Sequence, residues 1–376
     1  MNQLAKSNRV ILLTSHGPGD DPQGLAANLP DCEVISVSGA IPKVGSFAFA
    51  NALVKSWGSR YPVDVLKNRV PALKKEVLRV LATRPIDVCI SDFLSTALNV
   101  PLSGRIPTVL FQHNVEHIIW KRLKEVDPRK WRRVLLDVEW RKMRRVEAEA
   151  CATASLTLTV SDNDRDMLKK AAPAARVHSI PTGVDIHYFK PNGSNVAPME
   201  LVFAGAMDWY PNEDGILHFI EATLPIIRRQ VPNVTFTVVG RNPSIRVREA
   251  AQRSGVSVTG TVPDIRPYVS RAVVYVVPLR VGGGTRMKIF EALAMGKPVV
   301  STSIGAEGLP LTHGKHFFRA DDNEEFAKSV VSLLRDPAKR NSLATCGRRL
   351  VEERYSWEQV AEIFEARCKE VVKNAN

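Results

Sequence analysis

Short apolar segments alternate with longer amphipathic segments along the whole chain, and this alternation restricts the possible folds more than any other feature. Several apolar segments are continuous β-branched runs, as strands buried on both faces require. Those in the first half are Arg9–Ser15, Cys32–Ser38, Ile86–Asp92, Thr108–Gln112 and Leu156–Ser161. Those in the second half are Glu200–Gly205, Val234–Gly240, Val256–Gly260, Val273–Pro278, Pro298–Thr302 and His316–Arg319. The pattern predicts the α/β class, with parallel sheets covered by helices on both faces.

A cluster of turn-forming residues between Pro181 and Pro198 divides the chain into two halves of similar size. Each half has its own series of strands and helices, so we expect two Rossmann-like domains joined by a hinge. Two such domains leave a cleft between them, and ligands in parallel sheets bind at the carboxyl ends of the strands.

Charge and composition limit the class of partner. The chain has 376 residues, and 52 Lys and Arg against 39 Asp and Glu give a net charge of +13. Such an excess indicates an anionic partner: nucleic acid, anionic lipid or a phosphorylated substrate. The sequence has no zinc-finger pattern, RNP-type motif or obvious helix-turn-helix, so it does not indicate nucleic acid. No apolar run reaches the ~20 residues that span a bilayer, no signal peptide is visible, and the five scattered cysteines are typical of reduced cytoplasmic thiols.

More than half of the net charge lies between His117 and Arg145, where eleven Lys and Arg face four acids and leave +7. The segment from Lys130 to Ala150 lacks Gly and Pro and is predicted to be a helix. At 100° per residue, one side carries Trp131, Leu135, Val138 and Val146, and the other carries Lys130, Arg133, Trp140, Arg141 and Arg144. Two interpretations remain open: a solvated helix face, or a contact with an anionic membrane in which Trp140 lies in the interface.

The segment 278–302 has the order of features that a nucleoside diphosphate site needs. A strand ends at Pro278, and a glycine-rich loop and a helix start near Thr285 follow, where free backbone N–H groups favour an anion. The loop glycines are Gly282, Gly283 and Gly284. Arg286 and Lys288 add positive charge, and Glu291 can accept two hydrogen bonds from a ribose diol. A tight turn with surface charges is the alternative, but the combination favours a nucleotide site.

This segment resembles the signature of family 4 of the retaining, GT-B-type glycosyltransferases. Further motifs match in the same order: Phe111–Glu116 (FQHNVE), Ile180–Asp185 (IPTGVD), Phe203–Met207 (FAGAM), Val238–Arg241 (VVGR), Thr259–Asp264 (TGTVPD) and Tyr355–Trp357 (YSW). The chain is similar in particular to a bacterial exopolysaccharide branch with a GGGTR loop and a PN motif, here within Met207–Asp214. The resemblance implies an acceptor-binding domain over 1–184, completed by a C-terminal helix over 357–376, and a nucleotide-sugar-binding domain over 185–356.

The resemblance also implies the roles of individual residues. The donor is a UDP- or GDP-linked sugar, with Glu291 on the ribose and the backbone at Val262 on the base, near Arg241. Loop amides over 282–285 meet the sugar or its phosphates. In the first domain His113 contacts the donor sugar, and the loop containing Gly17 approaches the phosphates. Glu116 orients His113, binds the acceptor or caps the helix after Asn114.

Two departures from the family pattern affect the donor site. The family has two glutamates separated by seven residues, and the first falls here on Gly283. The usual Arg and Lys after the first strand of the second domain are absent from 206–212. We expect Arg286 and Lys288, with Arg280, to supply the missing charge at the diphosphate. Because such a cationic cradle can replace Mg²⁺, we expect no metal and no cofactor.

Together these features predict a retaining hexosyltransferase that transfers a sugar to a hydroxyl of a lipid-linked or polysaccharide intermediate. We expect a cytoplasmic protein, peripheral on the inner face of the plasma membrane where the basic helix binds lipid. Two alternatives remain. One is a non-catalytic scaffold that binds anionic membrane or polymer, for which the missing glutamate argues. The other is a nucleotide-sugar epimerase of the same fold, which needs acids in the cleft that the sequence does not assign.

Overall fold

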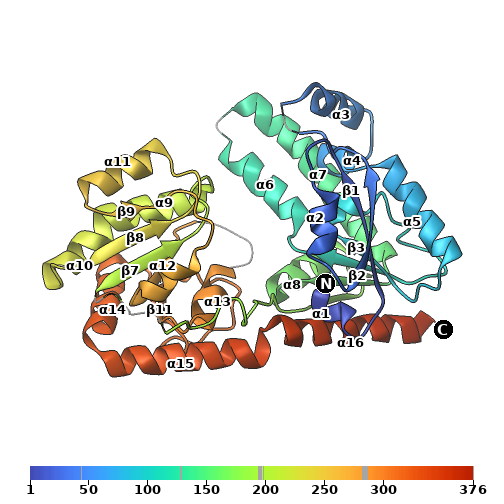
Figure 1. Cartoon of the computed structure of the whole chain (residues 1–376). Helices are drawn as coiled ribbons and strands as arrows, with labels where there is room; N and C mark the ends of the chain where they lie inside the picture. The colour runs from blue at the N-terminus through green and yellow to red at the C-terminus, as the bar shows by residue number, and fades with distance from the viewer. Residues whose placement is uncertain (44, 128, 194–196, 198, 282–286, 376) are drawn as a thin grey trace. The chain divides into compact units, whose positions relative to one another are not determined.

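The computed structural model describes residues 1–375 apart from 44, 128, 194–196, 198 and 282–286. The chain forms two compact units (Figure 1), of which unit 1 is Met1–Pro181 with Ala361–Asn376 and unit 2 is Thr182–Val360. The chain therefore crosses between units at 181/182 and 360/361, against predicted boundaries at 184/185 and 356/357.

The strands described in unit 1 all pair in parallel. They form a four-stranded sheet in the order β3-β4-β5-β6 and a separate pair, β1 with β2, in which Val10 faces Cys32 and His16 faces Ser38. Their bounds are β1 (Val10–His16), β2 (Cys32–Ser38), β3 (Cys89–Asp92), β4 (Thr108–Gln112), β5 (Leu156–Thr159) and β6 (Val177–Ser179). The sequence pattern misses β6, because a three-residue strand is too short to show a period.

Helices cover both sheets of unit 1. They are α1 (Asn2–Ala5), α2 (Pro22–Ala27), α3 (Phe47–Trp57), α4 (Val63–Lys67), α5 (Pro71–Thr83), η1 (Leu94–Thr96), α6 (Glu116–Val126), α7 (Lys130–Thr153) and α8 (Asp162–Ala171). The side chains of Asp21, Ser46 and Ser161 accept backbone N–H groups at the starts of α2, α3 and α8, which fixes where these helices begin.

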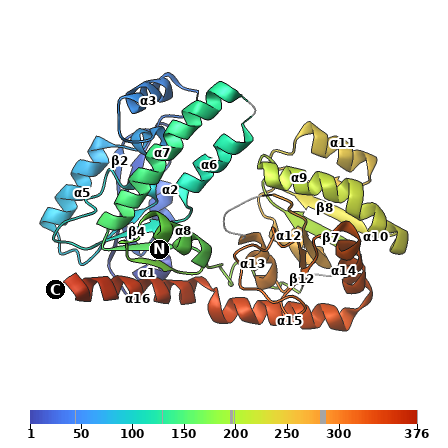
Figure 2. The ribbon, with the colours of Figure 1, turned by 180° about the vertical axis from the view of Figure 1, so that it is seen from behind.

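The last helix, α16 (Trp357–Ala375), supplies part of the core of unit 1, as its apolar spacing suggests. Phe364, Cys368 and Val371 are buried in one cluster with the strand residues Val109 and Leu156. Figure 2 shows α16 passing beneath α8 and β4, although these elements are far from α16 in the sequence. The sheet β3–β6 is thus covered on one face by residues more than 180 positions away from its last strand.

The strands described in unit 2 form one six-stranded parallel sheet in the order β12-β11-β10-β7-β8-β9. Its strands are β7 (Glu200–Ala204), β8 (Thr235–Val239), β9 (Ser257–Val258), β10 (Val274–Val277), β11 (Val299–Ser301) and β12 (Phe318–Arg319). The chain runs outward from β7 to β9 and then returns to the other side of β7 at β10. This reversal makes the carboxyl ends of β7 and β10 the topological switch point, where doubly wound sheets bind ligands.

The helices of unit 2 pack on both sides of this sheet. They are α9 (Tyr210–His218), the π-helical turn η2 (Phe219–Thr223), α10 (Leu224–Gln230), α11 (Ile245–Arg253), α12 (Arg266–Arg271), α13 (Met287–Ala294), α14 (Asn323–Arg335) and α15 (Pro337–Arg354). One continuous core joins sheet and helices, with Phe203, Phe219, Phe236 and Phe290 fully or almost fully buried. Among the described residues, no helix has both the length and the apolarity needed to cross a bilayer.

The two segments near the crossing points are hydrogen-bonded to each other. The Val184 N–H donates to the Tyr355 carbonyl over 2.7 Å, and the Trp357 N–H donates to the Val184 carbonyl over 3.1 Å. Gly183 lies so close to the Trp357 and Val360 side chains that a Cβ there would be 2.9–3.0 Å from them. These two segments therefore form one paired connection.

Candidate functional site

The switch point of unit 2 is closed by two tightly apposed loops. The Gly205 N–H donates to the Val239 carbonyl over 2.9 Å, and the Met207 N–H donates to the Arg241 carbonyl over 2.9 Å. A Cβ at Gly240 would lie 1.8 Å from the Gly205 carbonyl oxygen, so only glycine fits there. The loops after β7 and β8 therefore form a rigid backbone edge.

Lys288 brings a positive charge to the end of β7. It projects from α13, and its Nζ donates to the Asn212 Oδ1 over 2.8 Å and lies 4.2 Å from the centre of the buried Phe203 ring. A Cβ at Gly205 would come within 2.7 Å of this Nζ, so the ammonium occupies the space that glycine leaves open. The sequence lacks the expected cation in the loop after β7, and the structure places the Lys288 ammonium beside that loop.

Glu291 lies one helical turn beyond Lys288 and is mostly buried. Burial raises the pKa of its carboxyl group, and the Lys288 ammonium opposes that rise. The negative charge of Glu291 also helps to raise the pKa of Tyr275. The Tyr275 hydroxyl donates to the Ala204 carbonyl over 3.2 Å at the end of β7. A lysine and a carboxylate thus stand together at the switch point, able to bind a phosphate and a diol.

The other predicted donor residues are more dispersed. Arg280 forms a two-pronged ion pair with Asp214 of α9, with nitrogen–oxygen distances of 2.7 and 3.0 Å, and it lines a cavity of about 210 Å³ there. Arg241 is exposed and lies 3.6 Å from Asp208. Val262 lines a cavity of about 440 Å³ beside α12, with Tyr268 and others. Neither cavity is lined by Lys288 or Glu291.

Five of the predicted donor residues fall in the segment 282–286. They are Gly282, Gly283, Gly284, Thr285 and Arg286, and they lie outside the described residues. Within the described residues, no three His, Cys, Asp or Glu side chains gather closely enough to hold a metal ion.

In unit 1, His113 is held at the carboxyl edge of the sheet by three neighbours. It follows β4, and its Nε2 lies 2.8 Å from an Asp92 carboxylate oxygen at the end of β3. Its ring stacks on Phe93 at 4.2 Å between centroids and contacts Phe111 at 4.3 Å. Phe93 has a φ of +66°, an uncommon backbone conformation for an aromatic residue. The sequence singled out His113, but Asp92 and Phe93 were missed because they end a different strand.

A buried carboxylate fixes the start of the next helix. Glu147 of α7 accepts the backbone N–H groups of Glu116 and His117, at 2.8 and 3.2 Å, and also pairs with the His117 ring and with Gln112. Of the three roles offered for Glu116, capping is therefore wrong: the cap comes from Glu147, 31 residues away. Burial and the nearby Glu147 and Asp64 carboxylates raise the pKa of Glu116 to about 7.

The loop after β1 is built from turns. The Gly17 N–H donates to the Asp20 carboxylate over 2.7 Å, and Asp21 accepts the Gly24 N–H at the start of α2. Asp20 and Asp21 therefore each accept a hydrogen bond from a backbone N–H three residues away, and the Gly17 amide is engaged within its own loop.

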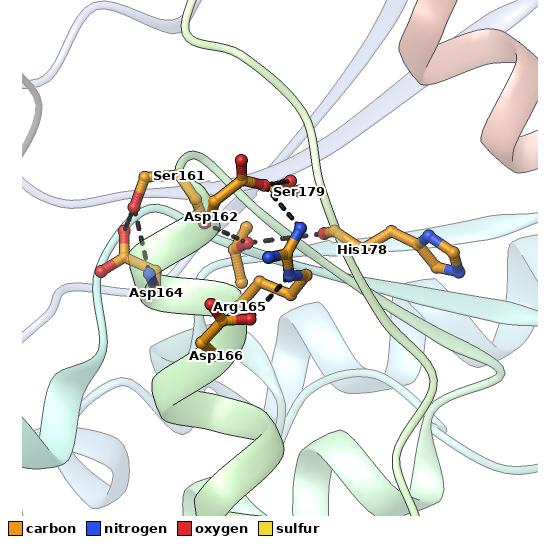
Figure 3. A network of polar contacts seen from close by, with 8 residues as sticks. Ser161, Asp162, Asp164, Arg165, Asp166, His178 and Ser179 are labelled. Atoms are coloured by element: carbon orange, nitrogen blue, oxygen red, sulfur yellow. Dashed lines mark hydrogen bonds and ion pairs between the residues drawn. The ribbon is translucent and has the colours of Figure 1, made fainter. Parts of the chain in front are cut away.

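A polar cluster that the sequence did not single out closes the carboxyl edge beyond β5 and β6. Figure 3 shows Arg165 of α8 between two carboxylates, Asp162 at 2.6 Å and Asp166 at 2.9 Å, while Ser179 also bonds to Asp162. Ser161 accepts the Asp164 N–H over 3.1 Å and donates to its carboxylate over 2.8 Å. The run Ser161–Asp164, with a hydroxyl before a helix and an acid three residues later, could have predicted this cap.

The basic helix α7 departs from its prediction. Of the four apolar side chains predicted to share one side of the helix, Val146 is buried, whereas Trp131, Leu135 and Val138 are exposed. The face that packs inward instead carries two glutamates, Glu139 and Glu147, among Met143, Val146 and Ala150. Glu139 accepts the Val63 N–H over 2.6 Å and the Ser56 hydroxyl over 3.2 Å. Partners distant in sequence thus satisfy two charges that a hydropathy pattern assigns to solvent.

The residues proposed to contact acceptor or membrane are also tied into the unit. The Arg133 guanidinium donates to two carbonyls at the end of α6, at 2.9 and 3.1 Å, and Arg141 pairs with Asp137 at 2.9 Å. The Trp140 ring lies 4.9 Å from the Lys124 ammonium and is only partly exposed. Arg144 is exposed.

Two family models match successive parts of the chain. Residues 2–188 match the family model described as Glycosyltransferase Family 4, and residues 198–336 match that of Glycosyl transferases group 1. The GDP-mannose-dependent alpha-(1-6)-phosphatidylinositol monomannoside mannosyltransferase of Mycobacterium tuberculosis is 25% identical over 214 residues, which cover 50% of this chain and 54% of that protein. The match thus spans about half the length of this curated relative.

Solved structures share the fold across nearly the whole chain. Sucrose-phosphate synthase from Thermosynechococcus elongatus superposes with a TM-score of 0.72 at 16% identity, covering 99% of this chain and 91% of that one. HepE of Anabaena, solved in complex with UDP, superposes with a TM-score of 0.65 at 16% identity, covering 96% and 100%. At such identities the likeness establishes the fold alone.

Proposed function

This chain belongs to family 4 of the GT-B glycosyltransferases, and from that premise we propose that it is a retaining hexosyltransferase. In this proposal it moves a hexose from a nucleoside diphosphate sugar to an acceptor hydroxyl. The observation that carries the proposal is the Lys288 ammonium at the end of β7, one helical turn from Glu291 and at the switch point of the sheet.

The proposed donor is a UDP- or GDP-linked sugar. The mycobacterial relative is named as GDP-mannose-dependent, and HepE was solved with UDP, so both bases have support among the proteins that this chain resembles. Glu291 takes the ribose diol, and the backbone at Val262, with Arg241, takes the base.

Departure of the nucleoside diphosphate leaves negative charge on its β-phosphate. The Lys288 ammonium, together with Arg286 and the amides of the loop 282–285, stabilises that charge, and this stabilisation is the main catalytic term. These positive groups do what Mg²⁺ does elsewhere, so the proposed reaction needs no metal. Arg280 makes a weaker contribution, because Asp214 already neutralises its charge.

The acceptor hydroxyl attacks the anomeric carbon on the face from which the diphosphate leaves. Its oxygen forms the new glycosidic bond, the bond to the phosphate oxygen breaks, and the acceptor proton passes to the departing phosphate. The configuration at the anomeric carbon is therefore retained. His113, held by Asp92, contacts the donor sugar and orients it for this attack.

The proposed acceptor is a lipid-linked or polysaccharide intermediate handled by unit 1. A lipid-linked acceptor has support in the phosphatidylinositol monomannoside of the mycobacterial relative's name. We place the enzyme in the cytoplasm, where its five free cysteines suit a reducing environment, with an anionic membrane as partner.

The test is a thermal-shift screen of UDP- and GDP-linked hexoses, followed by assay of UDP or GDP release with acceptor extracts. A true donor raises the melting temperature because it binds only the native state, and Glu291→Gln should reduce the shift. Binding without release on any acceptor would favour a non-catalytic scaffold. No shift with any nucleotide would refute the proposed donor class.

A further inference from the structure

The N-terminal half of α7 exposes a continuous apolar stripe. Trp131, Val134, Leu135 and Val138 follow the i, i+3, i+4, i+7 spacing of one helix face, and their exposed fractions are 63%, 64%, 41% and 45%. A stripe of this spacing normally packs against a core, and contiguous apolar surface left open marks an interaction site.

This stripe is not the face that α7 turns to the rest of unit 1. The inward face carries Met143, Val146 and Ala150, and the face toward α6 carries Arg133 and Asp137, which bond to the end of α6 and to Lys124. At 100° per residue the stripe is centred roughly 130° from the α6 side of the helix. Neither the inward packing of α7 nor its contact with α6 covers the stripe.

Helix α3 adds a second apolar face beside α7. It is anchored through Ser56, which donates to Glu139 over 3.2 Å and accepts the Lys142 ammonium over 2.6 Å at its carbonyl. Phe47 and Val54, seven residues apart, project from the opposite side, and Phe47 is 90% exposed. Figures 1 and 2 both show α3 beside the upper part of α7 at the same end of unit 1.

The surroundings of both helices are cationic. Residues 117–145 carry a net +7, and residues 40–60 contain Lys43, Lys55 and Arg60 without a single acid. Aliphatic and aromatic side chains surrounded by Lys and Arg are the composition of helices that lie in the interface of an anionic bilayer. A nucleic acid would use the cations but not the aliphatic row.

We propose that α3 and the N-terminal half of α7 form a docking surface for an anionic lipid bilayer. The inserted side chains are Phe47, Val54 and Trp57 of α3 and Trp131, Val134, Leu135 and Val138 of α7. The docking face is therefore not the one carrying Arg133, Trp140 and Arg141, which the helix uses within unit 1. The inference rests on the proposed function in one respect: docking on a bilayer would bring the enzyme to a lipid-linked acceptor.

Sedimentation with vesicles tests the docking surface. The full chain should bind vesicles of phosphatidylcholine mixed with phosphatidylglycerol, and bind less as salt rises, while vesicles of phosphatidylcholine alone retain little. Leu135→Asp should weaken binding about tenfold. Leu78→Asp on α5 (Pro71–Thr83) is the matched control, since Leu78 is similarly exposed, at 47%, and its substitution should leave binding intact.

Val134→Asp is a second variant in case Leu135→Asp does not fold, as judged by circular dichroism. Absence of vesicle binding by the parent chain would overturn the proposal, and so would equal loss in Leu135→Asp and Leu78→Asp. Retention of another protein on the stripe with no vesicle binding would also overturn it. Release of UDP or GDP by the parent chain is measured separately. Vesicle binding without any release would support the docking surface and count against the proposed transfer reaction.

Discussion

Replacing Lys288 with methionine removes the positive charge at the end of β7 and keeps an unbranched side chain of similar length. In the parent chain the ammonium is partly buried, 2.8 Å from the Asn212 Oδ1 and against the Phe203 ring. Methionine can still lie on Phe203, so the fold should tolerate the change. What is lost is the interaction with a doubly charged diphosphate.

The size of that loss follows from the environment of the ammonium. At about 4 Å and an effective dielectric constant of about 20, one pair of unit charges interacts by about 4 kcal/mol. The Lys288 ammonium already interacts with the Glu291 carboxyl group, since it opposes the rise of the Glu291 pKa. We therefore expect a net loss of about 2–3 kcal/mol, or roughly 30- to 160-fold in kcat/KM.

Steady-state release of UDP or GDP measures this loss, and Lys297→Met serves as the control. Lys297 is also buried, but it donates to the carbonyls of Ser270 and Ala272 at the amino end of β10, away from the switch point. Its loss should lower the melting temperature and leave the donor KM unchanged. Lys288→Arg should also lose activity, because the tight approach to Gly205 leaves no room for a guanidinium.

A Lys288→Met variant with kcat/KM within threefold of the parent would refute the assignment of the diphosphate charge. Equal losses in Lys288→Met and Lys297→Met would refute it too, because they would trace the effect to folding.

Three other substitutions test separate features. Gly240→Ala forces apart the loops after β7 and β8 and should lower the free energy of unfolding in urea by about 1–3 kcal/mol. Gly58→Ala is the control and should change it little, because Gly58 has open space around its Cα and a φ of −86°. Asp92→Ala removes the hydrogen-bond partner of the His113 ring and should lower kcat about tenfold. The melting temperature should not fall, because the Asp92 side chain is exposed. An unchanged kcat would show that Asp92 is not part of the site. The pKa of Glu116 is raised from 4.5 to about 7 on folding, so the native state binds the extra proton and stability falls as pH rises from about 4.5 to 7. Glu116→Gln should therefore be more stable than the parent at pH 8 but not at pH 4. A difference in urea midpoint between the two proteins that is the same at both pH values would contradict this.

The sequence predicts the scaffold well because buried parallel strands and amphipathic helices carry strong local patterns. The strands Cys32–Ser38 and Thr108–Gln112 have the bounds that the pattern predicts. The strand at Val177–Ser179 is missed, since it is recognisable only through its pairing with β5.

The polar contacts are harder to predict because they join residues that are distant in sequence. Lys288 reaches Asn212 across 76 positions, and Glu147 caps a helix that starts 31 residues earlier. The buried face of α7 was not predictable for the same reason: no local pattern indicates that a helix will bury Glu139 and Glu147 and leave Trp131 exposed.

The return of α16 to unit 1 affects the order in which the protein can be made. Unit 2 is one uninterrupted segment, so it is complete once residue 360 has been synthesised. Unit 1 is mostly N-terminal, yet its sheet lacks a covering layer until Phe364, Cys368 and Val371 have left the ribosome. The first unit to be translated is therefore the last to be finished. A chain that stops before residue 361 would present the apolar face of β4 and β5 to proteases and chaperones while unit 2 is fully folded.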